Sequence, residues 1–229
     1  MKSFNSYNND FSLITEWRLP PTAHDALQKQ NIYGKILSIL KNQLANDNAP
    51  LEHLWFKYFN DWTNKEQNIK IDISPEEGDI VAGASKDQDY IRIHSPNFWK
   101  FIQFRKSSPM ETLHAVFEHE LFHAIDPNFK TNLVKDQGSG KNIHLRETEI
   151  PAWLLTLITL LKSVIKTPKQ LEQFKNMISL PSKQFIDELR ILLYRNKLEK
   201  YGRDVFSYWQ SHPEVMKVFR QKLYKSFFE

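Results

Sequence analysis

The sequence contains no cysteine among its 229 residues. This absence excludes disulfide scaffolds, cysteine nucleophiles and every thiolate metal site. Any transition metal that the chain binds must therefore be held by histidine and carboxylate side chains. Eight His residues and 27 Asp and Glu residues are available for that purpose.

The chain also lacks the long apolar run of a transmembrane helix. Its longest apolar segment, residues 150–161, is interrupted by Pro151 and by threonines, and it falls short of the roughly 20 residues that a bilayer requires. The first ten residues show no apolar stretch typical of a secretory signal. We expect a cytoplasmic protein, or one secreted without a classical signal peptide, such as a translocated effector or toxin, and no membrane partner.

Basic residues are not clustered, although 31 Lys and Arg residues outnumber 27 Asp and Glu residues. No run of four or more basic residues occurs, so the charge does not predict a nucleic-acid partner. Glycine is scarce, with six residues in all. The one Gly-rich segment, residues 135–141, does not match the phosphate-binding pattern G-x-x-x-x-G-K-[ST]. The composition, 41% hydrophobic and 25% charged, predicts a globular protein, which we expect to be a monomer.

Hydrophobic periodicity predicts helices, then a small sheet, then more helices. Helical spacing begins at Thr22, which can cap the helix, and continues to Ala45; a second helix is predicted after Pro50. Alternation predicts three short strands, at residues 69–73, 80–81 and 90–93, with the last two forming a hairpin. Further helices are predicted over residues 97–106, 109–126, 149–166, 168–178, 181–200 and 203–228.

This order of elements predicts an α+β fold that is mostly helical, not a parallel doubly wound sheet. We expect a single domain over residues 1–229. Its N-terminal helices would span residues 22–68, its sheet and metal-site core residues 69–166, and its C-terminal helical part residues 167–229.

The segment His119–His123, H-E-L-F-H, matches the zinc motif H-E-x-x-H. On a helix, residues four apart share one face, so both imidazoles can converge on one ion. The preceding sequence predicts that helix: Ser108 is a suitable N-cap, Pro109 suits the first helical position, and Glu111 would complete a capping box. The alternative is that these are two surface histidines on an amphipathic helix, without a metal.

Two histidines leave a catalytic zinc short of its third protein ligand. A metzincin would have another histidine six residues after the second, but Phe129 occupies that position. The next predicted helix instead carries Glu147 and Glu149, which face different ways because they are two residues apart. We favour Glu149 because Ala152, three residues on, leaves room for close helix packing. Glu147 remains the alternative third ligand.

These motifs carry a family resemblance. The segment His119–Asp126, H-E-L-F-H-A-I-D, followed by a helix with E-x-E-x-x-A, resembles zincin metallopeptidases of the gluzincin type. The first motif is similar to those of the anthrax lethal factor catalytic domain and the Mlc titration factor group. The second is similar to that of phage-associated and regulatory peptidases of the ImmA/IrrE kind. The resemblance covers about residues 69–160.

The resemblance implies a zincin-like fold, with a three- to four-stranded sheet packed on the H-E-x-x-H helix. It also implies one bound Zn²⁺ ion and a protein or peptide substrate, as in a bacterial effector or a phage-associated protease. The substrate backbone would pair with a sheet edge, for which the sequence suggests the strand at residues 90–94.

The chemistry of the motif assigns roles to its residues. His119 and His123 would ligate zinc, and Glu120 would act as general base toward the attacking water. Asp126, three residues after His123, could accept the free ring N–H of that histidine, or it could simply end the helix before Pro127. The sequence favours no residue as oxyanion stabiliser.

The leading hypothesis is therefore a zinc metalloendopeptidase that hydrolyses peptide bonds of a protein. One alternative is a binding or regulatory module that keeps the zincin fold, although it would have no need of Glu120. Another is a zinc amidase acting on a non-peptide amide such as a cell-wall cross-link, which would need a secretion signal.

Overall fold

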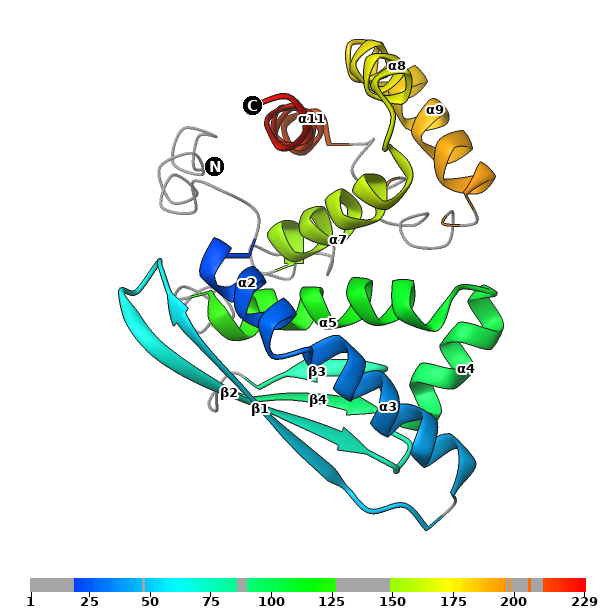
Figure 1. Ribbon diagram of the computed structural model, residues 1–229. Coiled ribbons are helices and arrows are strands. Elements are labelled where there is room, and N and C mark those ends of the chain that lie inside the picture. The colour runs from blue at the N-terminus through cyan, green and yellow to red at the C-terminus, as the bar shows by residue number, and fades with distance from the viewer. Residues whose placement is uncertain are drawn as a thin grey trace. The chain divides into compact units, whose positions relative to one another are not determined.

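The computed structural model describes residues 19–46, 48–85, 90–126, 149–196, 198, 206 and 212–229. They belong to two compact units, one spanning Leu19–Thr156 and the other running from Leu157 to Glu229. The first contains a four-stranded sheet with helices (Figure 1), and the second is helical in its described part. The predicted α+β class with mostly helical content is confirmed.

The sheet is mixed, and its strands follow the order β1-β2-β4-β3. β1 (Glu52–Asn60) pairs antiparallel with β2 (Lys65–Ser74), which pairs parallel with β4 (Tyr90–His94). β3 (Ala82–Ala84) pairs antiparallel with β4, as the predicted hairpin requires. It begins just after residues 80–81, where the sequence had predicted the strand.

The prediction of a helix after Pro50, and with it the assignment of residues 22–68 to helices, is wrong. Residues 52–60 form β1, and β2 begins within the same range at residue 65. Phe56, Tyr58 and Asn60 are buried, whereas Trp55 and Phe59 are exposed, which is the alternation of a half-buried strand. The aromatic side chains in this segment fit a pleated surface better than a helix. Over so few residues, their spacing is compatible with both the helical and the strand period, which is why the sequence alone did not separate the two.

The first predicted helix is two helices, α2 (Pro21–Lys29) and α3 (Ile32–Ala45). The break falls at Asn31, whose φ of 48° lies in the left-handed region that asparagine tolerates better than most residues. Thr22 does not cap α2, because Pro20 occupies the N-cap position. Its hydroxyl donates to the backbone carbonyl of Phe59 on β1 instead.

Side chains of α2 and the residue that follows it cover the free edge of β1. The side chain of Gln30 donates a hydrogen bond to the carbonyl of Lys57 and accepts one from the N–H of Lys57. The hydroxyl of Thr22 donates to the carbonyl of Phe59. Because these side chains satisfy backbone groups of β1, those groups are not available to pair with an additional strand.

Among the strands that the structure describes, the free edge at the other side of the sheet is β3, not the strand at residues 90–94 that the resemblance suggested. β4 lies between β2 and β3 and is therefore an interior strand. Ser85 N–H donates to the carbonyl of Tyr90, and His94 N–H donates to that of Val81. Because bonding alternates along an antiparallel ladder, the N–H and C=O groups of Ala82 and Ala84 point away from β4, toward the free edge.

The inner face of the sheet carries the core of the first unit. Its buried side chains are Phe56, Tyr58, Ile69, Ile71, Ile73, Ile91 and Ile93. α2 and α3 lie against β1, and α5 (Pro109–Ile125) lies against β3 and β4 (Figure 1). The packing of the sheet on the motif helix agrees with the prediction. α4 (Ser95–Arg105) connects β4 to α5.

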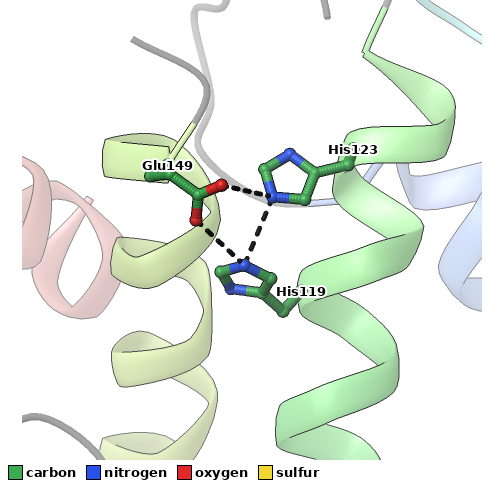
Figure 2. Close-up of side chains that lie close together, drawn as sticks. All are labelled: His119, His123 and Glu149. Carbon is green, nitrogen blue, oxygen red and sulfur yellow. Dashed lines mark hydrogen bonds and ion pairs between the residues drawn. The ribbon is translucent and has the colours of Figure 1, made fainter. Parts of the chain in front are cut away.

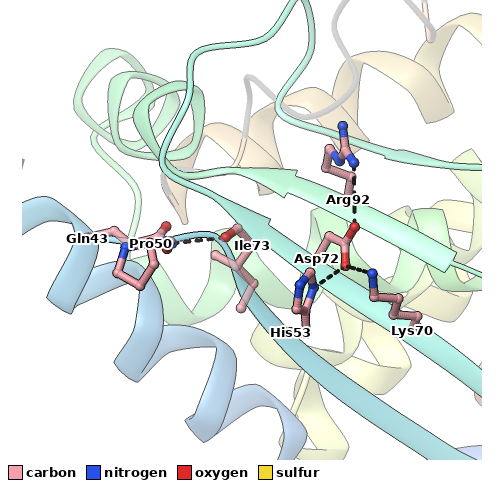
Figure 3. A network of polar contacts seen from close by, with 7 residues as sticks. All are labelled: Gln43, Pro50, His53, Lys70, Asp72, Ile73 and Arg92. Carbon is pink, nitrogen blue, oxygen red and sulfur yellow. Dashed lines mark hydrogen bonds and ion pairs between the residues drawn. The ribbon is translucent and has the colours of Figure 1, made fainter. Parts of the chain in front are cut away.

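The outer face of the sheet carries a buried carboxylate, Asp72 of β2 (Figure 3). It lies 2.7 Å from Nδ1 of His53, 3.1 Å from Nζ of Lys70 and 3.5 Å from a guanidinium nitrogen of Arg92. Burial alone would raise the pKa of Asp72, but the hydrogen bonds and charges of His53 and Lys70 outweigh it and lower that pKa. These contacts connect residues of β1, β2 and β4.

The second unit is built from helices with one apolar stripe each. α7 (Glu149–Val164) continues into it from the first unit, followed by α8 (Pro168–Ile178), α9 (Ser182–Arg195) and α11 (Pro213–Phe228). Its buried side chains include Phe174, Phe185, Leu189, Phe219 and Leu223. None of the helices in the described ranges combines the length and apolar character needed to cross a bilayer.

Candidate metal centre

The helix that carries H-E-x-x-H begins at the predicted cap and proline, but of the predicted capping box only the bond to the Ser108 side chain is found among the described contacts. The side chain of Ser108 accepts a hydrogen bond from the N–H of Glu111, and Pro109 is the first helical residue. The helix ends at Ile125, and Asp126 is extended, with ψ of 115°, because it precedes Pro127 and a proline disfavours the helical conformation of the residue before it. These local signals fix where the helix starts and ends, and they place both histidines of the motif inside it.

The structure brings His119 and His123 of α5 together with Glu149 in the first turn of α7 (Figure 2). Nε2 of His119 lies 3.2 Å from Nε2 of His123 and 3.4 Å from Oε2 of Glu149. Nε2 of His123 lies 3.7 Å from Oε1 of Glu149. All three side chains point toward one another, and those of His123 and Glu149 are 5% and 20% exposed.

The spacing of the two imidazole nitrogens and the two carboxylate oxygens of Glu149 suits ligands of a tetrahedral zinc ion. With bonds of about 2.0–2.1 Å, two ligand atoms of a tetrahedral ion lie roughly 3.3 Å apart. The separations from 3.2 to 3.7 Å lie close to that value. Two imidazoles and one carboxylate are also the ligand set of the His₂Glu zinc enzymes, which leave the fourth position open. The donor set therefore suits Zn²⁺.

The charges of the site favour a cation. Burial alone lowers the pKa of His119, but its hydrogen bond to Glu149 and the charges of Glu120 and Glu149 outweigh burial and raise that pKa. Burial and the neighbouring His119 lower the pKa of His123 to about 3. Below the raised pKa of His119, that ring carries an additional proton while His123 stays neutral, and a divalent ion would replace that proton.

Glu120 extends from α5 to the free edge strand. Its Oε2 accepts a hydrogen bond of 2.9 Å from the backbone N–H of Ala84 on β3. Burial raises the pKa of Glu120 to about 7, although His119 and the Ala84 N–H act in the opposite direction. A carboxylate with a pKa near neutrality can both take and return a proton at physiological pH.

Sequence reasoning missed the residues of α7 that contact His119. Oγ1 of Thr156 lies 3.4 Å from Nδ1 of His119, and the backbone of Ala152 contributes to the raised pKa of that ring. The indole of Trp153 meets that ring edge-on, with centroids 4.9 Å apart. The signal was present, since Thr156 lies seven residues after Glu149 and therefore on the same helix face. Ala84 has no such signal, because it contributes only a backbone group.

Glu118, next to His119 in sequence, faces away from the candidate site. Its Oε1 accepts a hydrogen bond of 2.8 Å from the hydroxyl of Tyr33 on α3 and lies 3.3 Å from Nδ1 of His114. The rings of Tyr33 and His114 are stacked, with centroids 3.9 Å apart. Burial, together with the charge and hydrogen bond of Glu118, raises the pKa of Tyr33. This part-buried contact links α5 to α3.

The other residues singled out in the sequence have mixed outcomes. Asp126 is the buried C-cap of α5. Since Nε2 of His123 faces Glu149, Nδ1 is the ring atom that Asp126 would accept from, and that contact stays a prediction. Glu147, the alternative third ligand, lies outside the described residues, as does the segment 135–141.

Comparisons with protein-family models, with curated proteins and with solved structures found no match to this chain.

Proposed function

We propose that the protein is a zinc metalloendopeptidase of the gluzincin type, with a zincin-like first unit, and that it hydrolyses peptide bonds of a protein substrate. The observation that carries this proposal is the convergence of His119, His123 and Glu149 within 4.8 Å of one another. These residues come from two helices, and Glu149 lies 26 residues after His123 in the sequence, yet their donor atoms are close enough to share one zinc ion.

His119, His123 and Glu149 would hold the ion through two neutral imidazoles and one carboxylate. A zinc ion at such a site lowers the pKa of a water molecule and polarises a carbonyl group. The chain contributes the electrostatic surroundings: three buried or half-buried ligands, with Glu120 close enough to interact with His119 and Glu149.

Glu120 would act as the general base. The Ala84 N–H holds Oε2, which leaves Oε1 as the oxygen that takes a proton from the attacking water. The same carboxyl group then returns the proton to the leaving amine as the peptide bond breaks, so that acid and base catalysis use one residue.

The free edge of β3 is the place where a peptide substrate would bind. The N–H and carbonyl of Ala82 and the carbonyl of Ala84 face the edge. They can pair with an extended backbone by β-strand addition. The opposite edge, β1, is covered by Gln30 and Thr22. A peptide on β3 would run beside Glu120, because Ala84 belongs to that strand and contacts that carboxylate.

The test is cleavage by the zinc-loaded full-length protein and by Glu120→Gln. A proteome treated with each protein and labelled at new N-termini should show cleavage products with the wild type alone. The matched control is Glu111→Gln, which removes an exposed carboxylate from the first turn of the same helix. Zinc binding without any new termini would contradict the proposal and favour a binding or regulatory module.

A further inference from the structure

Thr156 makes two hydrogen-bonding contacts that differ in direction. Its hydroxyl donates to the carbonyl of Ala152, 3.0 Å away and one turn earlier on α7. The same oxygen lies 3.4 Å from Nδ1 of His119. Because a hydroxyl has one proton, and that proton is used toward Ala152, the oxygen can only accept from the histidine.

The contact with Thr156 determines where the proton of a neutral His119 ring lies. Since the Thr156 oxygen accepts, Nδ1 must carry the proton that it donates. The neutral ring then has its lone pair on Nε2, the atom directed at His123 and Glu149 (Figure 2).

We propose that Thr156 is a positioning residue: with its own proton donated to the Ala152 carbonyl, its oxygen holds His119 in the Nδ1–H tautomer and so presents Nε2 to the metal. α7 thus serves the site twice, since its first turn supplies Glu149 and the turn after next fixes the tautomer of His119. The inference rests on the proposed zinc site for its consequence on metal affinity, but the tautomer itself is a property of the metal-free chain.

The tautomer can be measured directly. In the metal-free, ¹⁵N-labelled protein, long-range ¹H–¹⁵N spectra distinguish Nδ1–H from Nε2–H imidazoles, and a His119→Gln spectrum identifies the signals of His119. At a pH where the ring is neutral, we expect the wild type to show the Nδ1–H form. The Nε2–H form as the main species in the wild type would overturn the inference without any variant of Thr156.

Two variants of Thr156 test the consequence for zinc. Thr156→Val keeps the shape and removes the acceptor, and we expect zinc affinity to fall by about tenfold or more in chelator competition, as for other groups that orient a metal ligand. Thr156→Ser keeps the hydroxyl and should stay close to the wild type. Equal zinc affinity of Thr156→Val and the wild type would overturn the inference.

The outcomes separate this inference from the proposed function. If the wild type binds no zinc, the proposed function fails, while the tautomer of His119 still tests the positioning role. If the wild type binds zinc and Thr156→Val binds it equally well, the positioning role fails alone. Urea unfolding of both variants shows whether any loss of zinc affinity reflects a loss of folded protein. If it does, the zinc affinity of Thr156→Ser and the tautomer of His119 in the wild type decide whether the positioning role holds.

Discussion

The backbone N–H of Ala84 donates a 2.9 Å hydrogen bond to Oε2 of Glu120. This contact connects the free edge strand β3 to the helix that carries the candidate zinc ligands. In the proposed function, a peptide paired with β3 would lie beside Glu120 and the candidate zinc ligands, and the Ala84 N–H would couple substrate position to proton transfer.

Ala84→Pro removes that N–H and should lower kcat/KM. A hydrogen bond to a charged group contributes about 1.5–3 kcal/mol, which corresponds to a loss of about 10- to 150-fold. Proline is tolerated at a strand edge, so we expect zinc content to stay at the wild-type level. Ala84→Gly keeps the N–H and is the matched control. A proline variant with wild-type kcat/KM would show that Glu120 does not depend on this contact.

Glu149→Gln and Glu147→Gln should differ in zinc binding. Glu149 lies 3.4 and 3.7 Å from the two histidine nitrogens, and an amide cannot supply the negative charge of a carboxylate ligand. We expect Glu149→Gln to lose stoichiometric zinc in equilibrium dialysis, whereas Glu147→Gln retains it. The reverse pattern would make Glu147 the third ligand.

Zinc affinity should depend on pH through one proton. The raised pKa of His119 means that this ring is protonated in the metal-free protein at mildly acidic pH, while His123, with its pKa near 3, stays neutral. Zinc must displace the proton of His119, so its affinity should fall as the pH falls through the pKa of His119, by about tenfold per pH unit. Calorimetry in buffers of different ionisation enthalpy counts the released proton.

A matched variant makes that measurement specific. His114→Gln removes a histidine of the same helix that contacts Tyr33 and Glu118 and not the cluster, and it should keep the same pH dependence. A zinc affinity that does not change below the pKa of His119 would contradict the assignment of this ring as a ligand.

Asp72→Asn should destabilise the sheet at neutral pH by about 1 kcal/mol, since the carboxylate accepts charged hydrogen bonds whose donors are partly solvent-exposed. The lowered pKa of Asp72 makes its contribution fully present above the unfolded value of about 3.9. The contribution is lost as the pH falls through the lower folded value.

Urea unfolding at pH 7 and at acid pH measures this contribution. The difference between wild type and Asp72→Asn should shrink as the pH falls. Glu66→Gln, an exposed carboxylate on the same strand, should have little effect at either pH. A difference that is the same at both pH values would mean that the ionised carboxylate is not what stabilises the sheet.

Local sequence signals predicted the helix of the motif and the two histidines on it. A proline after a serine cap marks the start of α5, and a spacing of four places His119 and His123 on one face. Helix and strand patterns could not be separated for residues 52–60, where aromatic residues suit both periods. There the register with β2 decides, and it is a non-local property.

The remainder of the candidate site depends on contacts that a sequence does not contain. The sequence could limit the third ligand only to Glu147 or Glu149. The choice between them depends on how α7 packs against α5. The strand order makes β3 the free edge instead of β4, and it brings the backbone of Ala84 to Glu120. Thr156 contacts His119 only because α7 lies beside α5 along this stretch.

The metal content of the purified protein tests the central claim most directly. After exposure to zinc and removal of excess ion, elemental analysis should find about one zinc per chain in the wild type and in Glu120→Gln. His119→Ala and His123→Ala should retain almost none, because each loses one of the three ligands. A wild type without zinc, or a His119→Ala variant that keeps it, would contradict the His119, His123 and Glu149 site.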